Sequence, residues 1–167
     1  AHDHHAHRDA LHLDIFAENW SMIPDFGLPE RYGSTEPREG PFVDHTISHN
    51  TVMVDKSVQQ EAPGSCLAYD TGSVCQYVEI ESPGAYDQCN RYRRGVAMVE
   101  VSPEKTYFID IFRVSGGTQH DWLVHGNAAE LDSNLPLPEP RTEGTLAGPE
   151  VPYGHFYDDK KLAEAEY

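Results

Sequence analysis

"VAMVEVSPEKTYFIDIFRV" (residues 96–114) sets the fold class of this 167-residue chain. β-Branched and aromatic residues flank the polar stretch "SPEKT" (102–106), which is typical of two antiparallel strands joined by a tight turn. A second turn sequence, "SGGT" (115–118), follows at once and leads into a further apolar run. The stretch therefore predicts a meander of three consecutive antiparallel strands.

Turn residues separate short apolar runs in the rest of the chain as well. Its 13 glycines and 12 prolines separate short runs rich in Val, Ile, Tyr, Phe and Thr, so we expect an all-β fold, an antiparallel β-sandwich. The predicted strands are 10–17, 20–24, 50–55, 74–81, 95–101, 106–114 and 119–125. We expect the sandwich to span residues 1–126. Residues 127–167 are proline-rich and acidic, and we expect an extended segment that covers or leaves the sandwich.

The composition limits the partners of the chain. A formal net charge of −16 argues against nucleic acid, because phosphate binding needs a positive field. No apolar run approaches the roughly 20 residues of a membrane span, so we expect no membrane partner. The cysteines (Cys66, Cys75 and Cys89) lack the CxxC spacing of a zinc knuckle. One disulfide and three reduced thiols both remain open.

The first residues, "AHDHHAHRDALHLDIF" (1–16), combine histidines with acidic residues before turning apolar. On a β-strand, alternate residues share a face. His5, His7 and Asp9 would then lie on one face, above the aliphatic residues that enter the core. His12 would lie on the opposite, wetter face.

An H-x-H pair on one strand face suits a metal ion, because two imidazoles can converge on it. Asp25, at the end of the second predicted strand, and His49, at the start of the third, border the same long loop. A His/Asp/His set of this kind favours zinc, with manganese or iron as alternatives. A cupin also carries H-x-H on a strand, but the glutamate that continues its pattern is missing here, which leaves the cupin a minor alternative.

Three blocks of sequence, in order, resemble the heparinase II/III-like polysaccharide lyases. The blocks are "HHAHRDALHLDIFAENWSMIPDFG" (4–27), "SHNTVMVDKSVQ" (48–59) and "YFIDIFRVSGGTQHDWLVHG" (107–126). Lys56 departs from the pattern, because a glycine usually follows the aspartate of the second block.

The resemblance implies a larger architecture. In this family an N-terminal α/α toroid precedes a β-sandwich of the super-sandwich type, and the chain resembles only the start of that sandwich. We therefore expect an incomplete piece of a longer protein whose partner is its own toroid domain, and which is inactive alone. A homodimer is left open. The family implies a periplasmic or secreted location.

The resemblance also implies an activity and its residues. Members cleave uronic-acid-containing polysaccharides, such as alginate or heparan sulfate, by β-elimination. By position, His5 matches the catalytic histidine, and His7, Asp25 and His49 match the ligands of a zinc ion that is structural. An aromatic hydroxyl from the long loop contributes in some members, and Tyr32 is the candidate here. The alternative from another class is a non-catalytic carbohydrate-binding or structural β-sandwich module.

Other conspicuous residues have simpler interpretations. Trp20 and Trp122 are expected in the core, because aromatic side chains mostly serve packing, although Trp122 could also stack on a sugar. The basic cluster "RYRR" (91–94) is expected to be a solvated turn that offsets nearby acids.

Overall fold

The computed structural model describes residues 7–25, 45–126 and 132–139. Within these ranges the chain is all-β, with two short 3-10 helices and no α-helix, which confirms the predicted fold class. The elements are β1 (Ile15–Ala17), β2 (Trp20–Ile23), η1 (Thr46–Ser48), β3 (Val52–Val54), β4 (Ser65–Thr71), β5 (Cys75–Glu81), η2 (Pro83–Ala85), β6 (Cys89–Ser102), β7 (Lys105–Gly116) and β8 (His120–Trp122).

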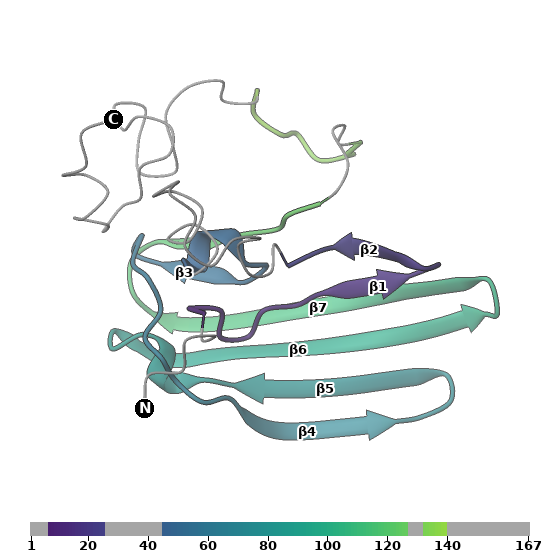
Figure 1. The fold of residues 1–167 in the computed structure, drawn as a ribbon, viewed down its shortest axis with the longest axis horizontal. Helices are drawn as coiled ribbons and strands as arrows, with labels where there is room; N and C mark the ends of the chain where they lie inside the picture. The colour runs from purple at the N-terminus through teal and green to yellow at the C-terminus, as the bar shows by residue number, and fades with distance from the viewer. Residues whose placement is uncertain (1–6, 26–44, 127–131, 140–167) are drawn as a thin grey trace, which may run out of the picture.

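The largest sheet is an antiparallel meander in the order β4-β5-β6-β7 (Figure 1). β6 and β7 are its longest strands, and they meet at the predicted turn around Pro103 and Glu104. β4 was not predicted. Every residue of β4 is exposed, so it is an edge strand whose sequence lacks the alternation that marks a half-buried strand. The other two sheets are the pairs β1-β2 and β3-β8.

The turn after β7 corrects the predicted meander. β8 pairs with β3, with Val52 opposite Trp122, rather than with β7. Gly116 and Gly117 have φ values of +103° and +76°, and a Cβ on Gly116 would lie 2.1 Å from the Gln88 carbonyl oxygen. Only glycine fits this backbone, which directs the chain away from β7 and across to β3.

The core lies between β3 and the β6-β7 part of the meander. Val52 and Val54 pack with Tyr86 and Tyr92, and Phe112 of β7 packs against the same cluster. The Tyr92 hydroxyl accepts a hydrogen bond from Gln59 Nε2 at 2.7 Å and donates one to the Val52 carbonyl. Burial raises the pKa of Tyr92 to about 12, so it keeps the proton that it donates.

Residues 7–14 do not form the predicted strand, since β1 begins only at Ile15. The Asp9 carbonyl accepts from the His12 amide at 2.9 Å in a turn, and Leu11 has a φ of +60°. Side chains satisfy the carbonyl groups that a strand partner would otherwise bind. The pairs are Thr46 to Arg8, Thr51 and Gln59 to Ala10, Arg94 to Leu11, and Asn50 to Leu13.

The cluster 91–94 is not a turn but part of β6. Arg94 is only 5% exposed and forms a bidentate ion pair with Asp110, at 2.9 and 2.6 Å. Its Nη1 also donates to the Asn50 carbonyl at 2.6 Å. Arg94 therefore ties the segment 7–14 and the start of β3 to the centre of the large sheet.

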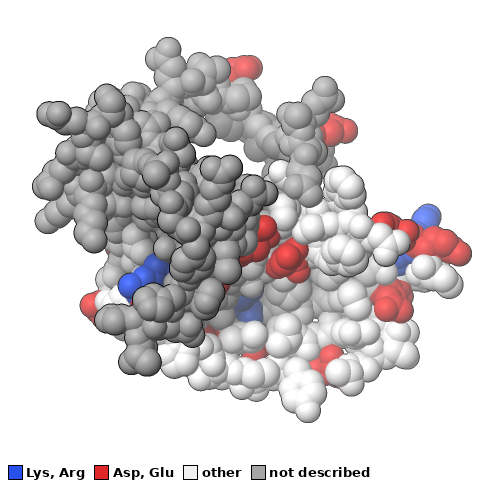
Figure 2. Space-filling view, in the orientation of Figure 1, with Lys and Arg blue, Asp and Glu red and all other residues white. Residues whose placement is uncertain are grey.

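Both tryptophans are exposed, Trp20 by 61% and Trp122 by 63%, so their predicted place in the core is wrong. Each lies on a short two-stranded sheet, whose strands offer little area to cover a large ring. All three cysteines are free thiols. On the face shown in Figure 2, acidic side chains are more widespread than basic ones among the described residues. No helix in the described ranges is long and apolar enough to cross a membrane.

Asn50 is fully buried and connects three segments. Its side-chain amide donates to the Leu13, Ile23 and Pro24 carbonyls at 3.0–3.2 Å, and its Oδ1 accepts from the His125 amide at 2.6 Å. Few side chains could replace it, because two N–H groups must serve three carbonyls while the oxygen of the same amide accepts.

Replacing Asn50 with alanine should lower the free energy of unfolding by about 3 kcal/mol, because several buried backbone groups lose their partner. Urea denaturation followed by circular dichroism measures this. Asn90→Ala, at an exposed position on β6, is the control and should change stability by less than about 0.5 kcal/mol. Equal stabilities of the two variants would contradict the role given to Asn50.

The side chain of Asp55 stabilises the turn between β7 and β8 by hydrogen bonds. Its Oδ1 accepts from the Thr118 amide at 2.7 Å, the Thr118 hydroxyl at 2.8 Å and the Gln119 amide at 2.9 Å. These hydrogen bonds lower the pKa of Asp55 to about 2. The neighbouring Lys56 has a φ of +58°, in the left-handed region that favours the glycine of the family pattern.

The contribution of Asp55 should depend on pH. Its pKa is depressed on folding, so its stabilisation is present above about pH 4 and is lost as the pH falls toward about 2. The urea midpoint of Asp55→Asn should therefore lie below that of the wild type at neutral pH, and the gap should narrow in acid. Asp87→Asn, at an exposed aspartate before β6, should show no such gap. A gap that is constant with pH would refute this account.

Candidate metal centre

His49 lies at the centre of a cluster of imidazoles and carboxylates. It follows η1, whose first turn is capped by the His45 ring accepting from the Ile47 amide. The His49 amide donates to the Thr46 carbonyl at 3.1 Å, and its side chain is only 1% exposed. Its Nδ1 lies 3.0 Å from Asp25 Oδ2, just beyond the end of β2. The β2 end and the η1 segment therefore meet at this ring.

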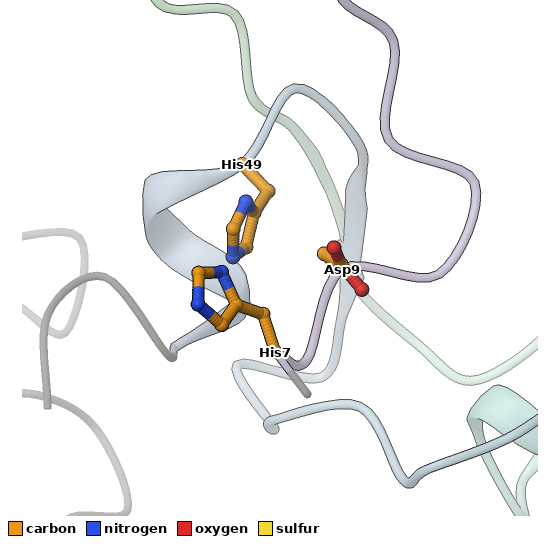
Figure 3. A group of neighbouring side chains, drawn as sticks. All are labelled: His7, Asp9 and His49. Atoms are coloured by element: carbon orange, nitrogen blue, oxygen red, sulfur yellow. The ribbon is translucent and has the colours of Figure 1, made fainter. Parts of the chain in front are cut away.

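His7 approaches His49 from the N-terminal segment. The two ring centroids are 5.4 Å apart, and Figure 3 shows the rings side by side, with Asp9 on the same segment as His7. One ligand atom from each of His7, Asp9 and His49 falls within 4.8 Å of the others. Turn geometry, rather than a shared strand face, brings these residues together.

His12 approaches His49 from another side. Its ring centroid is also 5.4 Å from that of His49, and its Nε2 lies 3.4 Å from Asp25 Oδ2. Its Nδ1 accepts a hydrogen bond from the Asn50 amide at 2.9 Å. Burial lowers the pKa of His12, against the opposing effect of the Asp25 carboxylate, which favours the neutral ring. His12, Asp25 and His49 form a second set of ligand atoms within 4.8 Å.

The predicted ligands are thus divided between two sets that share His49. His7 belongs to one set and Asp25 to the other. The predicted catalytic residues, His5 and Tyr32, lie outside the described residues. Of the predicted site residues, His7, Asp25 and His49 are therefore the ones that the structure describes, and His7 and Asp25 each lie beside His49.

The donor chemistry fits a zinc ion. His49 Nε2 is buried and has no hydrogen-bond partner among the described residues, which is costly unless something binds it. Nitrogen and carboxylate oxygen donors are the ligands that zinc takes in proteins. Tetrahedral zinc places neighbouring ligand atoms about 3.3 Å apart, so the 4.8 Å sets would contract slightly around an ion.

His12 was not a predicted site residue, although it is one of the closest neighbours of Asp25 and His49. Strand alternation assigned it to the wet face, whereas the turn at Asp9 reverses the direction of its side chain. One sequence feature could have identified His12: it belongs to the same histidine-rich run as His7 and lies five residues after it.

The remaining histidines of the last sequence block have structural contacts. His125 Nε2 donates to the Ile47 carbonyl at 2.8 Å, and burial lowers the pKa of His125. This bond joins the segment after β8 to the η1 segment that precedes His49. His120 is exposed, and its Nε2 donates to the Gly116 carbonyl at 2.8 Å.

Comparison with known proteins identifies the family. The sequence model described as "Heparinase II/III-like, C-terminal" matches residues 1–133, a range that contains the histidine cluster, all three sheets and every hydrogen bond described above. A search of curated proteins returned no match. The chain belongs to the heparinase II/III-like family and carries its C-terminal region.

Proposed function

We propose that this chain is the zinc-bearing β-sandwich part of a polysaccharide lyase that cleaves a uronic-acid-containing polysaccharide by β-elimination. The observation that carries the proposal is the cluster around His49, with its buried Nε2, in a chain of the heparinase II/III-like family. The proposal adds to family membership an ion, a reaction and a class of substrate.

His7, Asp25 and His49 would hold the zinc ion, as the family pattern implies. When bound, the ion would supply a structural link between three segments that share little regular secondary structure: the N-terminal segment, the end of β2 and the segment after η1. The contacts of Asp25 and of His7 with His49 support this assignment.

Elimination requires three tasks. The uronate carboxylate must be neutralised so that the C5 proton becomes acidic, a base must remove that proton, and an acid must protonate the departing O4 oxygen. His5 and Tyr32 are the candidates from this chain for the two proton transfers. The toroid expected upstream would supply the remaining groups, so we expect the isolated chain to be inactive.

The described residues hold the segment that leads to His5. Thr46 Oγ1 donates to the Arg8 carbonyl at 2.8 Å, and Thr51 Oγ1 donates to the Ala10 carbonyl at 3.0 Å. His5 precedes this anchored stretch by only a few residues. Rigid anchoring of this kind restricts the positions that a catalytic side chain can sample.

The acidic character of the chain favours a substrate whose charge comes from carboxylates alone. The sequence has 28 acidic and 12 basic residues, and Arg93, Arg94 and Arg113 on the large sheet are already paired with acids. A heavily sulfated polymer would meet more repulsion than alginate would. We therefore expect alginate to be cleaved in preference to heparan sulfate.

Zinc content tests the metal site. The chain purified with zinc and dialysed should retain about one ion per molecule, because three protein ligands hold a tetrahedral ion. His7→Ala, Asp25→Ala and His49→Ala should each lose most of it, as measured by mass spectrometry of the metal. His120→Ala, at an exposed histidine, is the control and should retain the ion. Unchanged content in the first three variants would remove the zinc assignment.

Activity is best tested on the full-length protein that contains this chain. Incubation with alginate should raise the ultraviolet absorbance of unsaturated uronate ends, with a smaller rise for heparan sulfate. His5→Ala should lower the rate about a hundredfold or more, because it removes a proton-transfer group, while His120→Ala should not. Polysaccharide binding without any product would instead favour a non-catalytic carbohydrate-binding module.

A further inference from the structure

A groove of about 380 Å³ lies between β8 and β7, and Val52 of β3 is among its lining residues. Its volume falls within the roughly 300–1,000 Å³ that small-molecule sites occupy. Within the described residues β8 pairs with β3 alone, and β7 is the last strand of the large sheet (Figure 1). Two strand edges therefore face each other across an open groove.

Trp122 is the large aromatic residue of this groove. It pairs with Val52 across the β3-β8 sheet, so the two side chains share a face. Val52 is 5% exposed, whereas Trp122 is 63% exposed. Phe112 and Val114 of β7 add apolar surface to the same groove. A tryptophan offers a flat apolar face and one N–H donor, which suits a ligand that is apolar on one side and carries oxygen atoms at its edge.

Asp110 is the acidic residue in the lining of the groove. Arg94 donates two hydrogen bonds to its carboxylate. A carboxylate has about four acceptor positions, so Asp110 can accept further hydrogen bonds from hydroxyl groups, while the ion pair carries no net charge. No described lining residue is a lysine or an arginine, so the groove lacks the cation that a sulfate group would need. Hydroxyl groups and an apolar ring face are therefore the chemistry that it fits.

The groove is continuous with the segment that carries His49. Val52 follows His49 by three residues, so their Cα atoms are at most about 11 Å apart. The Leu123 amide donates to the Thr51 carbonyl at 2.9 Å, which extends the contact between β8 and this segment toward His49. A polymer bound at the candidate metal centre could therefore continue along the β3-β8 sheet to Trp122.

We propose that this groove is a carbohydrate subsite, in which the C–H face of a sugar unit stacks on Trp122 and its hydroxyl groups donate to Asp110. A uronate unit would present its ring to the groove and its carboxylate to the solvent. The inference rests on the proposed function for the class of ligand. It adds a binding position away from the residues that hold the zinc ion and transfer protons.

Affinity for alginate oligosaccharides tests the subsite. Isothermal titration calorimetry of the full-length protein, with His5→Ala introduced to prevent turnover, provides the measurement. Trp122→Leu should weaken binding about tenfold or more, because it removes a large aromatic contact, and Trp122→Phe should weaken it less, because a ring remains. Trp20→Leu is the matched control, at a tryptophan of β2 that is 61% exposed, and should bind like its parent. Equal affinities of Trp122→Leu and Trp20→Leu would overturn the subsite.

Kinetics separate this subsite from the reaction centre. In the catalytically active full-length protein, Trp122→Leu should raise KM for alginate about tenfold and leave kcat within about twofold, because a contact that is equally strong in the ground and transition states changes KM alone. A fall in kcat at constant KM would refute a separate subsite. Binding that depends on Trp122 but yields no product would support the subsite and reject the lyase proposal. Absence of polysaccharide binding in the parent protein would overturn the subsite.

A footprinting measurement needs no variant at position 122. Saturating alginate oligosaccharides should slow hydroxyl-radical oxidation of Trp122 in the full-length protein and leave that of Trp20 unchanged, as read by mass spectrometry of peptides. Equal rates at Trp122 with and without the sugar would contradict the proposal. Light scattering tests the other occupant, a second copy of the chain. A dimer that Trp122→Leu converts to a monomer would make the groove a protein interface and overturn the subsite.

Discussion

Side-chain donors that hold the irregular backbone of residues 8–13 are the constraint on which the rest of this structure depends. This stretch has no strand partner, and its carbonyl groups accept from Thr46, Asn50, Thr51, Gln59 and Arg94. Buried backbone groups without partners are costly, so these few side chains decide where the N-terminal segment can lie. Arg94 binds the Leu11 carbonyl and is paired with Asp110, so it attaches this stretch to the middle of the large sheet.

The same hydrogen bonds build the candidate metal centre. Asn50 joins the segments on both sides of it, through Leu13 and Pro24 on one side and His125 on the other. Its backbone amide also donates to His12 Nδ1, and His12 lies beside the Asp25 carboxylate that contacts His49 Nδ1. The motif residues of the "SHNTV" block are therefore one connected unit, in which His49 is the residue proposed to bind zinc, and Asn50 and Thr51 hold the segment that brings His7 beside it.

Sequence patterns anticipated the regular part of the fold and missed the irregular part. The hairpin of β6 and β7 follows from β-branched and aromatic residues on either side of Pro103 and Glu104. β8 was assigned to the wrong partner, because two glycines with positive φ and the carboxylate of Asp55 direct the chain to β3. At the site, alternation gave His7 and His12 opposite faces, and this failed because Leu11 and the turn at Asp9 interrupt the strand.

The sequence by itself determined the all-β class, the family and the residue types from which a zinc site could be made, since composition, turn residues and motif order are local properties of the chain. Only the tertiary structure decided which histidines gather around His49, that His7 and Asp25 reach it from separate segments, and that His12 lies beside Asp25. The physical reason is that this region lacks a regular repeat. Its geometry is set by hydrogen bonds between residues about 25 to 80 positions apart, and no local pattern encodes such pairs.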